Sequence, residues 1–149
     1  MHEVDESVYL SKPLGIESLI IERIDSQKNP IRIYDQLGLR IPMHIGAANK
    51  AMLAYMPTSQ SDGILSTLMS KENIPEMKTA LTEIKKQGYA TSHGERTEDT
   101  FSVAVPILNR FEEAVGAISI GVVSFNLTDS RIEFLAEKAV ETGMRISGT

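Results

Sequence analysis

Two apolar runs within residues 100–124, separated by a short polar break, constrain the fold of this chain more than any other feature. The first run reads Thr-Phe-Ser-Val-Ala-Val-Pro-Ile-Leu, and the second reads Ala-Val-Gly-Ala-Ile-Ser-Ile-Gly-Val-Val-Ser. The break between them is Asn-Arg-Phe-Glu-Glu. Short apolar runs that flank a polar turn predict two paired β-strands. The rest of the chain is expected to be organised around this hairpin.

The alternation of large and small residues predicts how the two strands pair. Side chains alternate across a strand, and both runs alternate bulky residues with small ones. We expect Ser102 opposite Gly121 and Ala104 opposite Ser119, because this register puts all the bulky side chains on one face. A shift by one residue would mix the two kinds.

The face with the small residues has two possible interpretations. Its hydroxyl groups and shallow floor make it a candidate ligand site. The alternative is that small residues only allow a helix to pack closely on the sheet. The residues of the hairpin do not decide between the two.

Length and composition point to one globular domain. A chain of 149 residues can bury a core without disulfides, and no apolar run reaches the roughly 20 residues of a membrane span. Residues 1–6 lack the features of a secretory signal and are expected to form a tail before a domain at 7–149. Because the chain contains no cysteine, we expect a cytoplasmic protein without thiol chemistry.

The charge of the chain argues against direct DNA binding. The net charge is −5, and the only dense basic pair is Lys85-Lys86. A protein that grips a phosphate backbone carries a basic patch instead. We therefore expect no nucleic-acid contact by this part of the protein.

The remaining segments predict an α+β fold with a mainly antiparallel sheet and helices packed on it. Strands are expected at 7–13, 17–25, 31–37 and 89–93. Helices are expected at 47–56, at 60–70, from Pro75 to a left-handed cap at Gly88, and from Ser130, which has Glu133 at the capping-box spacing.

Gly46, Ala47 and Ala48 open the first predicted helix. Small residues there would let an anion approach the free N–H groups and the positive end of the helix dipole. The alternative is that a buried helix start needs small residues for packing alone.

Few residues suggest catalysis or metal binding. His44 and His93 lack the spacing of a zinc site, and a hydrogen-bonding role suits them better. Neither Ser102 nor Ser119 lies in a G-x-S-x-G motif or has a nearby base. We expect no catalytic residue, no metal and no cofactor.

Several segments together resemble the effector-binding domain of the isocitrate lyase regulator (IclR) family of bacterial transcription factors. They are residues 40–54 (Arg-Ile-Pro-Met-His-Ile-Gly-Ala-Ala-Asn-Lys-Ala-Met-Leu-Ala), Gly88-Tyr-Ala, Ser102-Val-Ala-Val-Pro-Ile and Ala117-Ile-Ser-Ile. The resemblance implies a GAF-like fold, a small organic acid or related metabolite as ligand, and a homodimer or homotetramer. It also implies that DNA is bound only through an N-terminal winged helix-turn-helix domain, which has no counterpart in this sequence.

The resemblance assigns ligand contacts to the helix start at Ala47 and Ala48 and to the strand positions Ser102, Ser119 and Gly121. With Gly46 and Ser92, these form the candidate ligand-binding residues.

Two positions depart from the pattern of the family. Asn49 stands where the family usually has Gly, and Ser92 stands where some members have an acidic residue. The identity of the effector therefore cannot be transferred. A small-molecule sensor is the main functional hypothesis; an oligomerisation module without ligand and an enzyme on a GAF scaffold are the alternatives.

Overall fold

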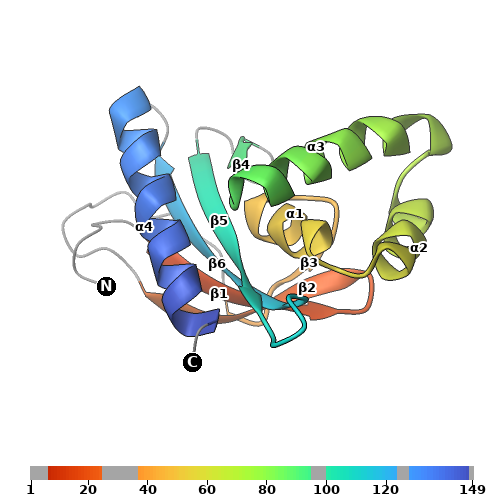
Figure 1. Ribbon diagram of the computed structural model, residues 1–149, viewed down its shortest axis with the longest axis horizontal. Helices are drawn as coiled ribbons and strands as arrows, with labels where there is room; N and C mark the ends of the chain where they lie inside the picture. The colour runs from red at the N-terminus through yellow and green to blue at the C-terminus, as the bar shows by residue number, and fades with distance from the viewer. Residues whose placement is uncertain (1–6, 25–36, 95–99, 124–127, 148–149) are drawn as a thin grey trace.

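The computed structural model describes residues 7–24, 37–94, 100–123 and 128–147, which form one six-stranded antiparallel sheet and four α-helices (Figure 1). The strands lie in the order β3-β2-β1-β6-β5-β4. Their bounds are Ser7–Leu14 (β1), Glu17–Ile24 (β2), Arg40–Pro42 (β3), Ala90–His93 (β4), Thr100–Leu108 (β5) and Ala114–Val123 (β6). The helices are Ala47–Ala54 (α1), Thr58–Leu68 (α2), Ile74–Gln87 (α3) and Asp129–Ser147 (α4), with a short 3-10 helix at Lys71–Asn73.

The predicted register of the β5–β6 hairpin is confirmed. Ser102 pairs with Gly121 and Ala104 pairs with Ser119. The turn is held by the side chain of Asn109, whose Oδ1 accepts hydrogen bonds from the N–H groups of Phe111 (2.9 Å) and Glu113 (3.1 Å). The pattern of bulky and small residues was sufficient to fix the pairing.

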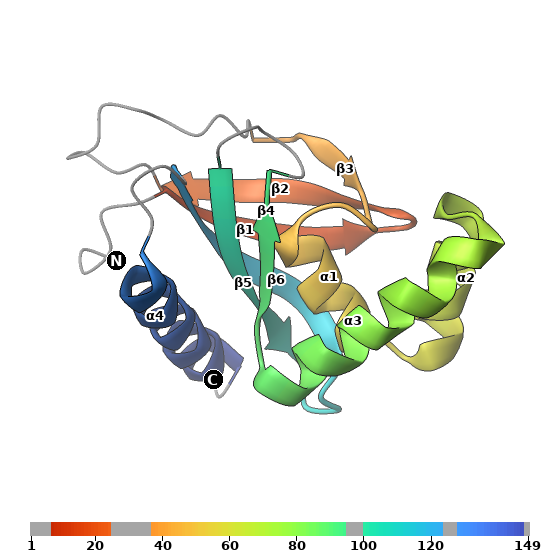
Figure 2. The ribbon, with the colours of Figure 1, turned by 90° about the horizontal axis from the view of Figure 1, so that it is seen from above.

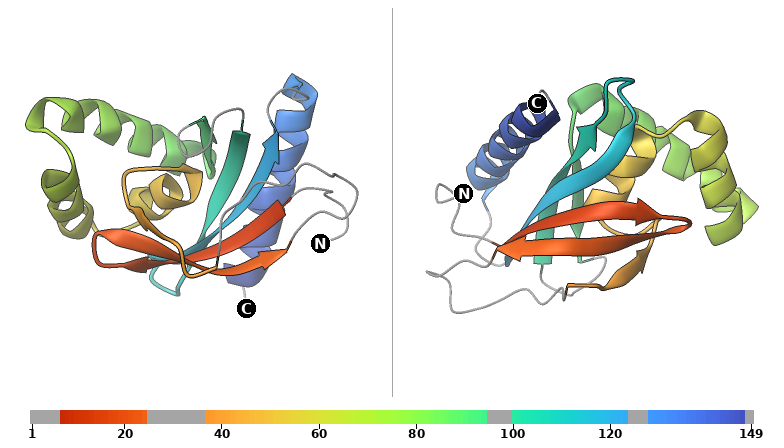
Figure 3. Two further views of the ribbon diagram at one scale, coloured as in Figure 1. Left: turned by 180° about the vertical axis from the view of Figure 1, so that it is seen from behind. Right: turned by 90° about the horizontal axis from the view of Figure 1, so that it is seen from below.

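The two faces of the hairpin are covered by different helices. The bulky face, with Val103 and Ile120 fully buried, packs against α4. The small face, with Ala104 and Ala117, packs against α1 and contributes to a core shared with α2 and α3. Figure 2 shows α4 on one side of the sheet and α1 to α3 on the other. The β1–β2 pair runs steeply across β5 and β6, so the sheet is curled and α1 lies on its concave side (Figure 3).

α4 approaches the sheet closely at Gly143. A Cβ atom at this position would lie 2.6 Å from Cγ2 of Val105, which is almost fully buried. No side chain fits in that space without displacing its neighbour. The glycine therefore sets the distance between α4 and β5.

Most of the predicted helices and strands are present. α3 ends at Gln87 and is followed by Gly88, which has a φ of 90° as expected for a left-handed cap. α2 begins at Thr58, two residues before its predicted start. The tail at 1–6 and residues 31–36 of the strand predicted at 31–37 lie outside the described residues. The last residue of that predicted strand, Leu37, is in a turn.

Two details of the prediction were wrong. No strand was expected at Arg40–Pro42, but these residues form β3 and pair with β2. The cap of α4 is Thr128, whose hydroxyl accepts a hydrogen bond from the N–H of Arg131 at 3.2 Å, so Ser130 lies inside the helix.

Candidate ligand-binding site

A pocket lies between the start of α1 and the concave face of the sheet. Its cavity volume is about 40 Å³, where one water molecule needs roughly 10–15 Å³. The lining residues are Tyr9, Ser11, Ile20, Ile41, Ile45, Gly46, Ala47, Ala48, Asn49, Ser92, Thr100, Phe101, Ser102, Ser119 and Gly121. The space suits a compact molecule of a few non-hydrogen atoms.

The first turn of α1 presents unused hydrogen-bond donors to this pocket. Gly46, the N-cap, has φ 91° and ψ 157°, a conformation open essentially to glycine alone, and no described side chain caps the helix. The first bond of the helix runs from the N–H of Lys50 to the carbonyl of Gly46, at 3.1 Å. The N–H groups of Ala47, Ala48 and Asn49 therefore precede the helical ladder, and none has a partner among the described residues. Such a helix start favours an anion.

Hydroxyl groups from four strands surround the same space. Ser92 on β4 and Ser102 on β5 lie opposite each other, with their Oγ atoms 2.8 Å apart. Ser119 lies on β6, next to Ser11 and Tyr9 of the neighbouring strand β1, and all three are buried. The hydroxyls of Ser11 and Ser119 make no hydrogen bond to another described residue. Both groups remain available to a ligand.

Asn49 differs from the other lining residues because its side chain is already anchored. It is only 2% exposed, and its Nδ2 donates to the carbonyl of Pro42 at 3.0 Å and, at a longer 3.5 Å, to that of Ile41. These bonds tie the first turn of α1 to β3. The amide therefore has a fixed orientation, with its NH₂ toward the strand.

Among the described residues that line the pocket, none carries a carboxylate, ammonium, guanidinium or imidazole group. An anionic ligand would meet their backbone N–H groups and hydroxyls without a repelling acidic side chain. His44 and His93 are not among the lining residues; the ring of His93 packs edge-on against Phe101, at 5.9 Å between ring centroids. In the described part of the chain, no three His, Asp or Glu side chains gather as metal ligands.

The structure brings all seven predicted site residues to this one pocket. They are Gly46, Ala47, Ala48, Ser92, Ser102, Ser119 and Gly121. Both interpretations of the small face describe part of it, because Ala104 and Ala117 pack against α1 while Ser102 and Ser119 border the cavity. Small residues thus serve packing at one end and leave space at the other.

Eight lining residues were missed. Four of them, Tyr9, Ser11, Ile20 and Ile41, come from β1, β2 and β3, and no local pattern announces that β1 pairs with β6. The others are Ile45, Asn49, Thr100 and Phe101. Asn49 did carry a signal, since it replaces a glycine in the segment that resembles the IclR family.

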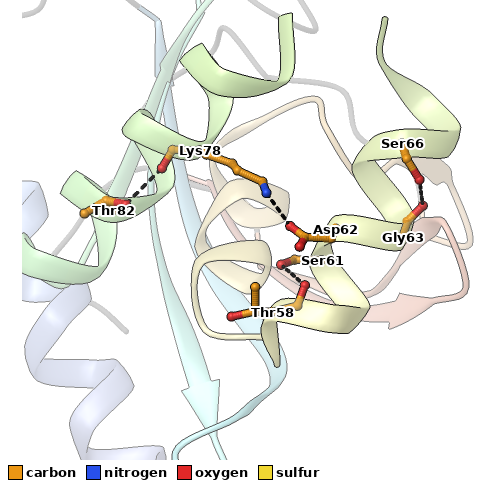
Figure 4. A network of polar contacts seen from close by, with 7 residues as sticks. All are labelled: Thr58, Ser61, Asp62, Gly63, Ser66, Lys78 and Thr82. Atoms are coloured by element: carbon orange, nitrogen blue, oxygen red, sulfur yellow. Dashed lines mark hydrogen bonds and ion pairs between the residues drawn. The ribbon is translucent and has the colours of Figure 1, made fainter. Parts of the chain in front are cut away.

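A second groove lies between α1, α2 and α3, and its polar groups are largely paired with one another (Figure 4). Lys78 and Asp62 join α3 to α2 through an ion pair of 2.8 Å, with both side chains nearly half exposed. Ser61 donates a hydrogen bond to the carbonyl of Thr58 at 3.2 Å. This groove is better explained as a seam between helices than as a ligand site.

None of the helices in the described ranges combines the length and the apolar character needed to cross a bilayer.

Comparison with known proteins identifies the family of the chain. The model for the C-terminal domain of the bacterial transcriptional regulator IclR matches residues 1–148. The HTH-type regulator KipR of Bacillus subtilis is 27% identical over 152 residues, which are 97% of this chain and 60% of that protein. KdgR of Dickeya chrysanthemi is 29% identical over 140 residues, which are 88% of this chain and 45% of that protein. The chain thus spans about half the length of these relatives.

Solved structures show the same fold. The crystal structure of Thermotoga maritima IclR matches with a TM-score of 0.82 at 25% identity, over 99% of this chain and 64% of that one. The C-terminal domain of Escherichia coli KdgR matches with a TM-score of 0.83 at 21% identity, over 98% of this chain and 88% of that one. The GAF-like α+β architecture expected from the sequence is confirmed.

Proposed function

The chain belongs to the IclR family of bacterial transcriptional regulators, as their C-terminal effector-binding domain, and from this premise we propose that the pocket beside α1 binds a small organic acid. Such a domain is a regulator module and not an enzyme. The single observation that carries the proposal is the uncapped start of α1. Three N–H groups without partners among the described residues, those of Ala47, Ala48 and Asn49, border a cavity whose described lining includes no acidic side chain.

The carboxylate of the ligand would sit at this helix start. The chain as a whole is acidic, so long-range attraction does not draw an anion toward it. The charge must be met at short range by the helix N–H groups and by the hydroxyls of Ser92, Ser102 and Ser119, with Gly46 and Gly121 keeping the space open. A ligand bound in this way makes charge-assisted hydrogen bonds, which are the stronger kind.

Calorimetry with matched pairs of acids and amides tests this proposal. Acetate and acetamide, or propionate and propionamide, have nearly the same shape but differ in charge. We expect the acid of at least one pair, two to six carbons long, to bind at least about tenfold more tightly than its amide. Equal binding of acid and amide throughout the series, or no binding of any acid, would refute the anion site.

Occupancy of the pocket would be passed on to a DNA-binding domain elsewhere in a longer, cytoplasmic regulator. The names of KipR and KdgR describe both as HTH-type regulators, and the chain covers only 60% and 45% of their lengths. Both facts support this proposal. In the described residues α1 contacts β5 and β6 on one face, and α4 contacts them on the other. A shift of α1 on ligand binding would therefore reach α4 through two strands. Hydrogen exchange of α4 with and without a bound acid tests this coupling.

Self-association of the domain is a further part of the proposal. Four apolar side chains at the tip of the β1–β2 hairpin and beside β3 are exposed: Leu14 (38%), Ile16 (41%), Leu37 (57%) and Leu39 (39%). We expect a dimer or a tetramer, with these residues in its interface. Light scattering at tens of micromolar that gives the mass of the monomer would contradict this expectation.

A further inference from the structure

We infer that Asn49 makes the pocket selective for acids that also carry a hydroxyl group, such as 2-hydroxy acids, over acids that lack one. This inference rests on the proposed function, because it assigns a second contact to a ligand whose carboxylate sits at the start of α1. Asn49 belongs to that same first turn. The first turn of α1 would then bind both the carboxylate and the hydroxyl group of the ligand.

The hydrogen bonds of Asn49 determine which end of its amide is available. Nδ2 donates to the carbonyls of Pro42 and Ile41, which only an NH₂ group can do. Oδ1 must therefore point away from these carbonyls. No described residue donates a hydrogen bond to it.

Oδ1 is also not sealed inside the protein. Within the described ranges, the buried side-chain polar atoms that lack both a partner and contact with solvent are Ser18 Oγ and His44 Nδ1. Asn49 Oδ1 is not one of them, although the residue is only 2% exposed and lines the pocket. Because Asn49 lines the pocket, we take the accessible side of Oδ1 to face that space.

The chemistry of this oxygen restricts the ligand. A serine hydroxyl can turn to donate or to accept, but an amide oxygen only accepts. An acid with only carboxylate and carbon atoms would face Oδ1 with an acceptor or an apolar group, and a buried acceptor without a donor is costly. A ligand hydroxyl supplies the missing donor.

A hydroxyl suits this position better than an ammonium group. An ammonium group would also donate to Oδ1, but none of the described pocket residues is an acid that could balance its charge. The fixed amide oxygen requires a hydrogen-bond donor on the ligand. Because the described lining has no carboxylate, a neutral hydroxyl is favoured over a charged ammonium group. We therefore expect 2-hydroxy acids to bind and the corresponding 2-amino acids to be excluded.

The test uses matched ligands of two to six carbons, for example glycolate with acetate and lactate with propionate, and alanine as the amino analogue. Calorimetry on the protein should give a hydroxy acid at least about tenfold tighter than its deoxy partner, with alanine weaker than both. In Asn49→Gly and Asn49→Leu this preference should fall to within about twofold. Asn73→Ala, at an exposed asparagine before α3, is the control and should keep the full preference.

The ratio of the two affinities separates recognition from structural support. If the Asn49 variants lost only the support of α1 by β3, the affinities for the hydroxy acid and the deoxy acid would fall together. Their ratio would then be unchanged. Asn49→Gly restores the residue that the resembling family usually has, so it keeps the test valid even if Asn49→Leu does not fold.

Three results would overturn the inference while leaving the acid site in place. They are equal binding of hydroxy and deoxy acids by the unmodified protein, a preference that survives in both Asn49 variants, and alanine binding as tightly as lactate. Failure of every acid to bind would instead refute the proposed function.

Discussion

The hydroxyl oxygens of Ser92 and Ser102 lie 2.8 Å apart across the β4–β5 ladder, on the wall of the pocket. One of the two must donate to the other, so the pair has a single proton left to offer to a ligand. This arrangement makes the two serines a unit rather than two independent contacts.

Replacement of these serines should therefore be strongly non-additive. Either Ser92→Ala or Ser102→Ala leaves one hydroxyl free to donate, and we expect binding of the acid to change by less than about threefold. The double variant loses the donor and should bind about tenfold more weakly. Calorimetry on the four proteins measures this, with Ser66→Ala on the exposed face of α2 as the control. A double variant that binds like the parent would remove both serines from the site.

The start of α1 should be sensitive to charge more than to bulk. Ala48→Glu would place a carboxylate where the ligand carboxylate is proposed to lie, whereas Ala48→Gln adds nearly the same volume without the charge. We expect the Glu variant to bind the acid at least about tenfold more weakly than the Gln variant. If the two bind equally, only steric exclusion operates at this position. Ala47→Gly keeps the backbone donors and should retain binding.

Affinity for the acid should be independent of pH between about 6 and 9. None of the described lining residues has a carboxylate, ammonium, guanidinium or imidazole group that could change its charge in this range. Binding should fall only below about pH 5, where the carboxyl group of the ligand itself begins to take up a proton. Calorimetry across the pH range checks this. A transition between pH 6 and 9 would show that an ionisable group outside the described lining contributes to binding.

Stability should respond in opposite directions to alanine at two helical glycines. Alanine favours a helix over glycine by about 1 kcal/mol, and Gly63 in α2 has open space around the added Cβ. Gly63→Ala should therefore stabilise the fold by up to about 1 kcal/mol. Gly143→Ala would press on the stiff side chain of Val105, and overpacking costs about 1–3 kcal/mol, so destabilisation should prevail. Urea unfolding of both variants measures the two effects.

Tyr55 should make the fold less stable at alkaline pH. Its hydroxyl donates to the carbonyl of Lys85 at 3.2 Å, and burial, with a smaller contribution from the charge of Glu112, raises its pKa above the ordinary value of 10.0. A folded-state pKa above the unfolded one means that the folded protein holds the proton more tightly. The stabilisation is complete below pH 10 and is lost as the pH rises from 10 through the folded-state pKa.

Comparison with Tyr55→Phe isolates this effect from the titration of other groups. The difference in free energy of unfolding between parent and variant should be constant below pH 10 and should shrink above it. A constant difference up to pH 11 would mean that the pKa is the same in both states.

The hairpin was predictable because its information is local. Large and small residues alternate in both strands, and only one register sorts them, so the sequence alone assigns Ser102 and Ser119 to the same face. The start of α1 was predictable for a similar reason, since Gly46, Ala47 and Ala48 are consecutive small residues between a loop and a helical segment.

The missed features depend on contacts between distant segments. Tyr9 and Ser11 reach the pocket only because β1 pairs with β6, more than 100 residues away along the chain, and no pattern within β1 encodes that neighbour. β3 contains three residues and one of them is Pro42, so it offers too little alternation to be recognised. The role of Asn49 depends on the carbonyls of β3, which only the folded chain brings next to the first turn of α1.

The division of the β5–β6 hairpin into two faces has a consequence for evolution. Positions such as Ser102, Ser119 and Gly121 border the pocket, whereas Val103 and Ile120, their neighbours on the same strands, hold α4. Natural selection can therefore exchange residues on one side of the hairpin for new chemical preferences while the other side continues to maintain the fold. After gene duplication, a few substitutions on the pocket side could change which effector the domain binds. The variants along the way would still fold, because the side that holds α4 is unchanged.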